Sequence, residues 1–334
     1  MRNVTLRQLR VFTAVARHLS FTRAAHELHL TQPAVSQQMK LLEQEAGMPL
    51  IEQIGRRIRL APAGAELLRY ATQVTELLRE AGEALAAMQG LKRGVLKLGA
   101  VSTAKYFAPA LLSAFTREYP EVTIKFAIGN RGEVVRMLGD NESDLVIMGR
   151  PPRELTTASE SFARHPFVII ASPHHPLAAR RRIPLEALAS ESFIIREESS
   201  GTRASMEQVF RERGVPLRTS MEVSSNETIK QAVMAGMGLS FISSHTVGLE
   251  FEAGRLAILD VTGLPIVRDW YVIRLREKVL PPIAAAFWGF LLQNGARIIE
   301  QTVGGPSRGK GARVPRRADP APCPRRAPSR ATRK

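Results

Sequence analysis

Apolar side chains recur at helical spacing through the first part of the chain and are interrupted at two polar corners. Between residues 5 and 18 they lie three and four positions apart, which predicts an amphipathic helix. Ser20 and Thr31 are favourable N-cap residues, so two further helices are expected to begin at these corners. The second of them has an inward stripe formed by Val35, Met39 and Leu42. The pattern predicts a helix-turn-helix over residues 21–40.

The outward face of that last helix carries side chains suited to reading DNA. Pro33 occupies the first turn, where a missing N–H costs no hydrogen bond. The polar positions facing away from the apolar stripe are Gln32, Ser36, Gln37 and Lys40. A solvated helix face usually carries glutamate and lysine, whereas amides and hydroxyls donate and accept as base edges require. We therefore predict that this helix enters a major groove.

A short hairpin is expected after the recognition helix, between residues 53 and 60. Two β-prone runs flank a tip that contains Gly55, Arg56 and Arg57. Two guanidinium groups at such a tip suit contact with phosphate or insertion into a minor groove. The alternative is a solvated turn with two arginines, and the neighbouring recognition helix favours the DNA contact.

A heptad pattern of apolar residues follows the hairpin. No proline interrupts the chain between Pro62 and Pro109, and spacings of four and three alternate through three heptads. Such a seam predicts a linker helix over residues 62–91 that pairs with a second copy of the chain, whereas packing on its own domain would give a wider stripe. The positions predicted for dimerisation are Leu67, Ala71, Val74, Leu78, Ala81, Leu85 and Met88.

Apolar strands alternate with amphipathic helices from residue 94 to residue 303, which predicts an α/β domain. The expected elements include a helix at 104–119, a strand at 167–170 and a final helix at 283–299. The strands expected at 95–101, 122–128 and 144–149 are nearly continuously apolar and alternate with helices, which indicates that they form a parallel sheet.

Two crossovers divide this predicted domain into a subdomain of residues 94–164 and 266–303 and a subdomain of residues 165–265. Such an architecture binds ligands in the cleft between its halves, at strand C-termini and helix N-termini. Polar side chains stand at three helix starts: Ser102, Thr103 and Lys105, then Thr202 and Arg203, then Asn226. Free N–H groups, hydroxyls and two cations predict a site for phosphate or carboxylate. Helix capping alone is the alternative for each stretch.

The net charge of +16 is unevenly distributed along the 334 residues. Residues 306–334 carry ten lysine and arginine residues against one aspartate and are rich in proline, so we expect a disordered basic tail. These cations would add non-specific affinity for DNA, with a dispensable extension as the alternative.

The remaining composition limits the kinds of site that the chain can contain. The single cysteine, Cys323, excludes a disulfide framework and a cysteine metal site, and the seven histidines show no metal-ligand spacing. We expect no metal and no cofactor. No apolar run has the length of a signal peptide or a membrane span, which indicates a cytoplasmic protein without membrane contact.

Residues 4–61 resemble the N-terminal domain of the LysR-type transcriptional regulators. The segments that carry the resemblance are LRQLRVF at 6–12, SFTRAA at 20–25, TQPAVS at 31–36 and LLE at 41–43. The resemblance implies that Gln32, Pro33, Ser36 and Gln37 lie at the DNA, and that Arg56 and Arg57 hold its backbone or minor groove. Gln37 stands where the family often has arginine. Because glutamine favours adenine and arginine favours guanine, base preference should differ there.

The following domain resembles the periplasmic-binding-protein fold that LysR regulators use for effectors, and most closely that of the CbbR-type regulators of Calvin-cycle and Rubisco operons. This similarity rests on VSTAKYF at 101–107, IGNR at 128–131, SGTR at 200–203 and SNETIKQAV at 225–233. It implies a phosphorylated sugar, another phosphorylated metabolite or NADPH as effector, and it adds Asn130 to the candidate effector-binding residues. Glu197, Glu198 and Ser199 stand where the subgroup often has a glycine, which places acids beside the proposed anion.

The chain is thus expected to be a sequence-specific transcriptional regulator and not an enzyme, since no nucleophile or base constellation is found. The predicted fold is α/β, with an all-α winged helix-turn-helix, a linker helix and a two-subdomain effector domain. Expected partners are double-stranded DNA with an interrupted dyad, a small anionic metabolite, a second copy of the chain and, by analogy, a tetramer and RNA polymerase. Alternatives are a LysR-type regulator of another operon with a carboxylate effector, and a solute-binding protein.

Overall fold

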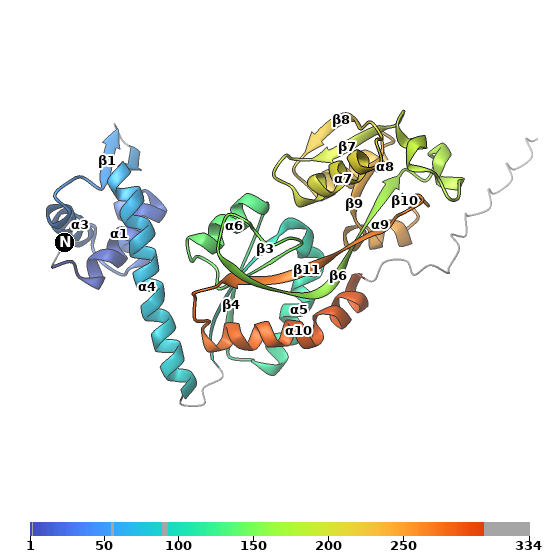
Figure 1. Cartoon of the computed structure of the whole chain (residues 1–334). Coiled ribbons are helices and arrows are strands. Elements are labelled where there is room, and N and C mark those ends of the chain that lie inside the picture. The colour runs from blue at the N-terminus through green and yellow to red at the C-terminus, as the bar shows by residue number, and fades with distance from the viewer. Residues whose placement is uncertain (2, 55–56, 89–92, 304–334) are drawn as a thin grey trace, which may run out of the picture.

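The computed structural model describes residues 1, 3–54, 57–88 and 93–303. A helical N-terminal domain lies at one end, the long helix α4 (Pro62–Met88) leads away from it, and a two-lobed α/β domain follows (Figure 1).

Three helices and a two-stranded hairpin form the N-terminal domain around one apolar core. Its elements are α1 (Leu6–His18), α2 (Phe21–Glu27), α3 (Gln32–Ala46), β1 (Ile51–Ile54) and β2 (Arg57–Leu60). The hydroxyls of Thr5, Ser20 and Thr31 accept backbone N–H groups and begin the three helices. Gly47 ends α3 with a φ of 70°, which glycine adopts without steric cost. The predicted helix-turn-helix is confirmed, and its inward stripe is buried: Val35, Met39 and Leu42.

The linker helix α4 begins against the hairpin of the N-terminal domain. A Cβ atom on Gly64 would lie 2.0 Å from the carbonyl oxygen of Leu50, so only glycine permits this approach. The first two positions of the predicted seam, Leu67 and Ala71, pack into the core of the N-terminal domain. The next four positions are exposed: Val74, Leu78, Ala81 and Leu85. The side chain of Met88 lies outside the described residues.

A mixed seven-stranded sheet extends through the α/β domain. Its strands are β3 (Gly94–Val101), β4 (Val122–Gly129), β5 (Leu145–Met148), β6 (Thr157–Ala171), β9 (Ser240–Ser243), β10 (Ala257–Ile258) and β11 (Ile266–Leu275). β3 pairs in parallel with β4 and β5, whereas β11 is antiparallel to both β5 and β6. The long strands β6 and β11 run from one lobe into the other (Figure 1), and β9 and β10 pair with β6 in the second lobe.

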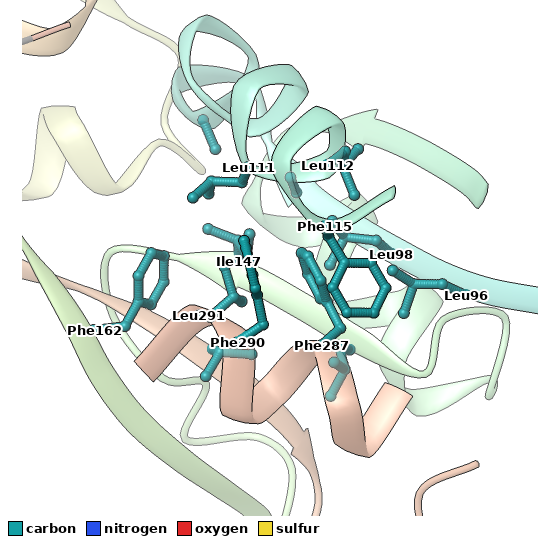
Figure 2. Close-up of a cluster of buried hydrophobic side chains, with 14 of the residues drawn as sticks. Leu96, Leu98, Leu111, Leu112, Phe115, Ile147, Phe162, Phe287, Phe290 and Leu291 are labelled. Atoms are coloured by element: carbon teal, nitrogen blue, oxygen red, sulfur yellow. The ribbon is translucent and has the colours of Figure 1, made fainter. Parts of the chain in front are cut away.

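The first lobe places α5 (Ala108–Glu118) and α10 (Pro282–Val303) on one face of its sheet and α6 (Arg131–Gly139) on the other. Figure 2 shows side chains of α10 pointing toward Phe115 of α5 and Ile147 of β5. The ring of Phe115 meets those of Phe287 and Phe290 edge to face, at centroid distances of 4.9 and 5.4 Å.

The second lobe has its own core between 167 and 264. Its remaining elements are β7 (Ser192–Arg196), β8 (Arg218–Val223), α7 (Gly201–Glu212), α8 (Asn226–Met234), α9 (Gly248–Glu252) and the 3-10 turns η2 (Pro176–Ala179) and η3 (Leu185–Leu188). β7 and β8 are parallel, and Phe193 of β7 bridges to Leu239 beside β9.

Two sequence-based expectations were wrong in detail. The helix expected at 104–119 is split into a 3-10 turn, η1 (Ser102–Tyr106), and α5, because Pro109 lacks an N–H and its ring would clash with a preceding helical turn. β6 begins ten residues earlier than expected, and its polar first half is held by pairing with β11. The parallel sheet expected from the first strands is confirmed for β3, β4 and β5, and the crossover strands β6 and β11 extend it with antiparallel pairs.

Candidate functional site

The residues of α3 predicted to read DNA lie opposite its buried stripe and are exposed or half-buried: Gln32, Pro33, Ser36, Gln37 and Lys40. Nε2 of Gln32 donates to Oγ of Ser36 at 2.9 Å, which arranges two polar side chains at the start of the helix. A protruding helix with amides, a hydroxyl and one ammonium on its outer face has the chemistry of major-groove recognition.

Glu43 connects the end of the recognition helix to the hairpin. Its Oε1 accepts the backbone N–H groups of Leu50 and Ile51 at 2.9 and 3.2 Å. The carboxylate therefore fixes where the hairpin β1–β2 sits relative to α3. Arg56 and the side chain of Arg57, both predicted to contact DNA, lie outside the described residues.

The second candidate site lies where the two lobes of the α/β domain meet. Arg196, the last residue of β7, is almost fully buried there. Its Nη1 donates to Oδ1 of Asn226 at 2.6 Å, and its Nη2 donates to Oγ of Ser102, in the other lobe, at 3.3 Å. Glu197 neutralises the guanidinium with two hydrogen bonds, of 2.7 and 2.8 Å. One buried cation thus joins predicted effector-binding residues from both lobes.

Two buried polar groups in this region lack a hydrogen-bond partner among the described residues. They are Nδ2 of Asn226 and Oγ of Ser244, on side chains exposed to only 2% and 4%. Ser244 begins the turn η4 (Ser244–Thr246), which packs against η1 of the opposite lobe. An unsatisfied buried donor is costly, so these two groups are candidates for binding a polar ligand.

A second bridge between the lobes is formed by Glu227 in the first turn of α8. Its Oε2 accepts Nζ of Lys105 at 2.6 Å, and its Oε1 accepts the hydroxyl of Tyr106 at 2.5 Å. Burial alone would raise the pKa of Glu227, but the hydrogen bonds from Lys105 and Tyr106 lower it to about 2. Nζ of Lys230 lies 4.9 Å from the ring centroid of Tyr106 and pairs with Glu250 at 2.7 Å.

The structure brings together some of the predicted effector-binding residues and separates others. Ser102 and Asn226 share Arg196, and Thr103 and Thr202 are buried at the starts of η1 and α7. Arg203 is engaged elsewhere, because its guanidinium pairs with Glu207 at 2.8 Å and with Glu222 at 2.7 Å. Asn130 caps α6 through a capping box with Glu133. Nη1 of Arg203 also donates to the backbone carbonyl oxygen of Arg196 at 3.4 Å, so Arg203 meets the Arg196 group only through the main chain. The capping contacts of Asn130 do not reach that group.

Behind this junction of the lobes, which we call the cleft, aromatic rings join the crossover strands. The ring of His165 on β6 stacks on Trp270 of β11 at 3.9 Å, and Nε1 of Trp270 donates to Nδ1 of His245 at 3.2 Å. Burial lowers the pKa of His245 to about 4, and burial followed by the charge of His245 lowers that of His165. Both imidazoles are therefore neutral at pH 7, and this packing fixes the lobes at their hinge.

Sequence reasoning missed four residues of the cleft: Tyr106, Arg196, Lys230 and Ser244. Arg196 had a readable signal, since it directly follows the apolar run 193–195 and stands four residues before Ser200 at a predicted helix start. The others had none, because their roles depend on contacts between segments far apart in the chain.

A winged helix-turn-helix, a linker helix and a two-lobed domain with polar side chains in contact across its lobe junction are the features of a ligand-responsive DNA-binding regulator. The family described as bacterial regulatory helix-turn-helix protein, lysR family, matches residues 6–65, and the LysR substrate binding domain matches residues 89–296. The chain belongs to the LysR family of transcriptional regulators.

Relatives of known role extend over nearly the whole chain. A RuBisCO operon transcriptional regulator of Allochromatium vinosum is 48% identical, with 89% of this chain and 98% of that protein covered. The HTH-type transcriptional regulator CbbR of Rhodospirillum rubrum is 49% identical over 86% of this chain and 95% of its own length. The regulatory domain of CcmR from Synechocystis PCC6803, in complex with 2-PG, is 40% identical with a TM-score of 0.58, covering 60% of this chain and 96% of that one.

The family assignment confirms the predicted fold and the regulator class. Because the matched family consists of DNA-binding regulators, the alternative of a solute-binding protein is rejected. Within the described part of the chain, no cluster of three or more candidate ligands could hold a metal ion. The helices in the same part of the chain are all too short or too polar to cross a membrane.

Proposed function

We propose that this protein regulates genes of carbon fixation, in particular a Rubisco operon, and that a small anionic metabolite bound between its lobes changes how it holds DNA. The observation that carries the proposal is the buried Arg196, which is shared by Ser102 and Asn226 from opposite lobes. The relatives named as Rubisco operon regulators and the CcmR domain in complex with 2-PG support it.

The cleft supplies the groups that a phosphorylated or carboxylated metabolite requires. Arg196 offers a guanidinium, Ser102 and Thr202 offer hydroxyls, and Nδ2 of Asn226 is an unsatisfied donor. Because these groups belong to both lobes, an anion that contacts all of them would stabilise one relative orientation of the lobes. 2-PG is the first candidate, followed by a phosphorylated sugar and NADPH, with a simple carboxylate as the rival effector class.

Self-association would pair the DNA-binding domains. The exposed apolar positions of α4 form a stripe that a second copy of the same helix would cover: Val74, Leu78, Ala81 and Leu85. A dimer places two recognition helices on one face of an interrupted dyad. A tetramer, contact with RNA polymerase and a cytoplasmic location complete the proposal by analogy with the family.

Footprinting of the purified protein on the promoter of a Rubisco operon, with and without 2-PG, tests this function. We expect protection of an interrupted dyad that changes in extent when 2-PG is added. Asn226→Ala should retain the footprint and lose most of the response, about tenfold or more in the 2-PG concentration required, since a buried polar contact is removed. The matched control is Ser205→Ala, a half-buried residue of α7 whose hydroxyl donates only to the carbonyl of Gly201 in its own helix. A footprint unaffected by 2-PG, phosphorylated sugars and NADPH would contradict the proposal, and a response to simple carboxylates alone would favour the rival class.

A further inference from the structure

Every cation of the cleft described above already has a carboxylate partner. Arg196 pairs with Glu197, Lys105 with Glu227, and Lys230 with Glu250, at shortest distances of 2.6 to 2.7 Å. The charges of these six side chains sum to zero, so the cleft does not present an excess of positive charge to an anion. An anionic ligand that pairs with one of these cations must share it with, or take it from, a carboxylate of the protein.

The three carboxylates differ in how firmly they are held. The side chain of Glu197 is 17% exposed and makes two hydrogen bonds to the guanidinium next to it in the chain. Glu250 is 22% exposed and pairs with a lysine of its own lobe. The side chain of Glu227 is 46% exposed and takes its two short hydrogen bonds from Lys105 and Tyr106 of the opposite lobe, with a longer one of 3.5 Å from Oγ of Ser225 in its own lobe. If the carboxylate of Glu227 leaves Lys105 and Tyr106, water can therefore solvate it.

The position of Glu227 also places it beside the proposed ligand groups. It is the neighbour of Asn226 in the first turn of α8, and Lys105 lies in the same 3-10 turn as Ser102 and Thr103. Its two oxygens receive an ammonium and a hydroxyl, which is the donor set that a phosphate or carboxylate of a ligand would use. Two anions within reach of one ammonium repel each other, so both cannot keep these donors at full strength.

We infer that Glu227 is an internal competitor of the effector, an acidic side chain that occupies Lys105 and Tyr106 until the anionic metabolite displaces it. This inference rests on the proposed function and specifies its regulation. Displacement exchanges a protein anion for a ligand anion, so Glu227 sets the effector concentration at which the protein responds. It also couples binding to lobe geometry, because releasing Glu227 removes one bridge between the lobes.

The experiment is calorimetric titration of the full-length protein with 2-PG, comparing the wild type with Glu227→Gln. Glutamine keeps the shape of the side chain and removes its charge. We expect the Kd of 2-PG to fall about tenfold in the variant, since a competing charge has been removed. The gain should shrink at high salt, because it is electrostatic. Glu222→Gln is the matched control, since Glu222 pairs with Arg203, which meets this group only through the backbone carbonyl of Arg196, and the Kd of this variant should equal that of the wild type.

The outcomes test the role of Glu227 and the proposed function separately. An unchanged or weaker affinity in Glu227→Gln, with clear binding by the wild type, would overturn the role of Glu227 and leave the proposed function standing. Equal gains in Glu227→Gln and Glu222→Gln would also overturn it, because a general change in net charge would then explain the effect. Failure of both the wild type and Glu227→Gln to bind 2-PG, a phosphorylated sugar or NADPH would remove the anionic effector and this inference with it.

Discussion

Two groups of ion pairs anchor the first lobe, one at its base and one at the cleft, and they differ in burial. At the base, Asp144 is fully buried and accepts Nη2 of Arg79 at 3.1 Å, Nζ of Lys278 at 2.9 Å and the backbone N–H of Lys97 at 2.9 Å. At the cleft, Glu227 accepts Lys105 and Tyr106 while nearly half of its side chain remains exposed. Both groups consist of a carboxylate that accepts hydrogen bonds from cationic side chains, but only the carboxylate at the cleft is accessible to solvent.

Because of this difference in burial, the Asp144 cluster is a fixed connection, which we call the clamp, whereas the Glu227 pair is exchangeable. Asp144 connects the linker helix through Arg79, strand β3 through Lys97 and the segment after β11 through Lys278. Glu76 of α4 adds an ion pair with the side chain of Lys97. A buried carboxylate with this many donors cannot leave without stranding charges in the interior, so it holds α4 against the first lobe. Glu227 has water as an alternative partner and can be exchanged.

The largest effect is expected when the clamp is broken. Asp144→Asn should lower the free energy of unfolding by about 3–5 kcal/mol, because Arg79 and the buried Lys278 lose their shared negative charge. Urea denaturation followed by tryptophan fluorescence measures it. Glu66→Gln is the control, since Glu66 forms an exposed pair with Arg69 on the same helix. A loss below about 1 kcal/mol in Asp144→Asn would show that the base cluster is no clamp.

A buried group without a counter-ion should respond to pH. The pKa of His245 is about 4 in the folded protein and about 6.5 when unfolded, so the unfolded state binds more protons between these values. Stability should therefore fall as pH drops from 6.5 to 4, by about 3 kcal/mol in total. His165 contributes in the same direction, since its pKa is also lowered by burial.

Denaturation at several pH values isolates this contribution when the wild type is compared with His245→Gln. Glutamine can still accept Nε1 of Trp270 and does not titrate in this range. The variant should lose less stability on acidification than the wild type does. Equal losses in both proteins would mean that the hinge histidine does not titrate as its burial indicates.

The sequence predicted the parts of this molecule that depend on local chemistry. The helix-turn-helix could be located because Ser20 and Thr31 cap helices whose apolar positions lie within one turn of each other. The break at Pro109 was missed because the apolar spacing continues across it. The polar first half of β6 was missed because only its pairing with β11, about one hundred residues later, makes it a strand.

The single residues of the cleft show the same limit of prediction from the sequence. Ser102, Thr202 and Asn226 were suggested by their places at helix starts, whereas the role of Arg196 depends on a contact with Ser102 across 94 positions of the chain. The sequence pointed to Arg203 instead, because it stands in the first turn of a predicted helix. Its side chain pairs with Glu207 one helical turn later, which is a local i,i+4 pattern, and with Glu222 on β8, which no local pattern shows.

The smallest effect on stability is expected from Glu227→Gln, in the same protein that should bind 2-PG more tightly. Its partner Lys105 is one-third exposed, so removal of the carboxylate leaves no charge buried without water, and the cost should stay below about 1 kcal/mol. The same urea denaturation, run beside Asp144→Asn, gives the comparison directly. If both variants lost several kcal/mol, Glu227 would be a second clamp, and a side chain that cannot leave its partners cannot compete with an effector. A small stability cost together with a tighter Kd is therefore the combination that identifies an exchangeable carboxylate.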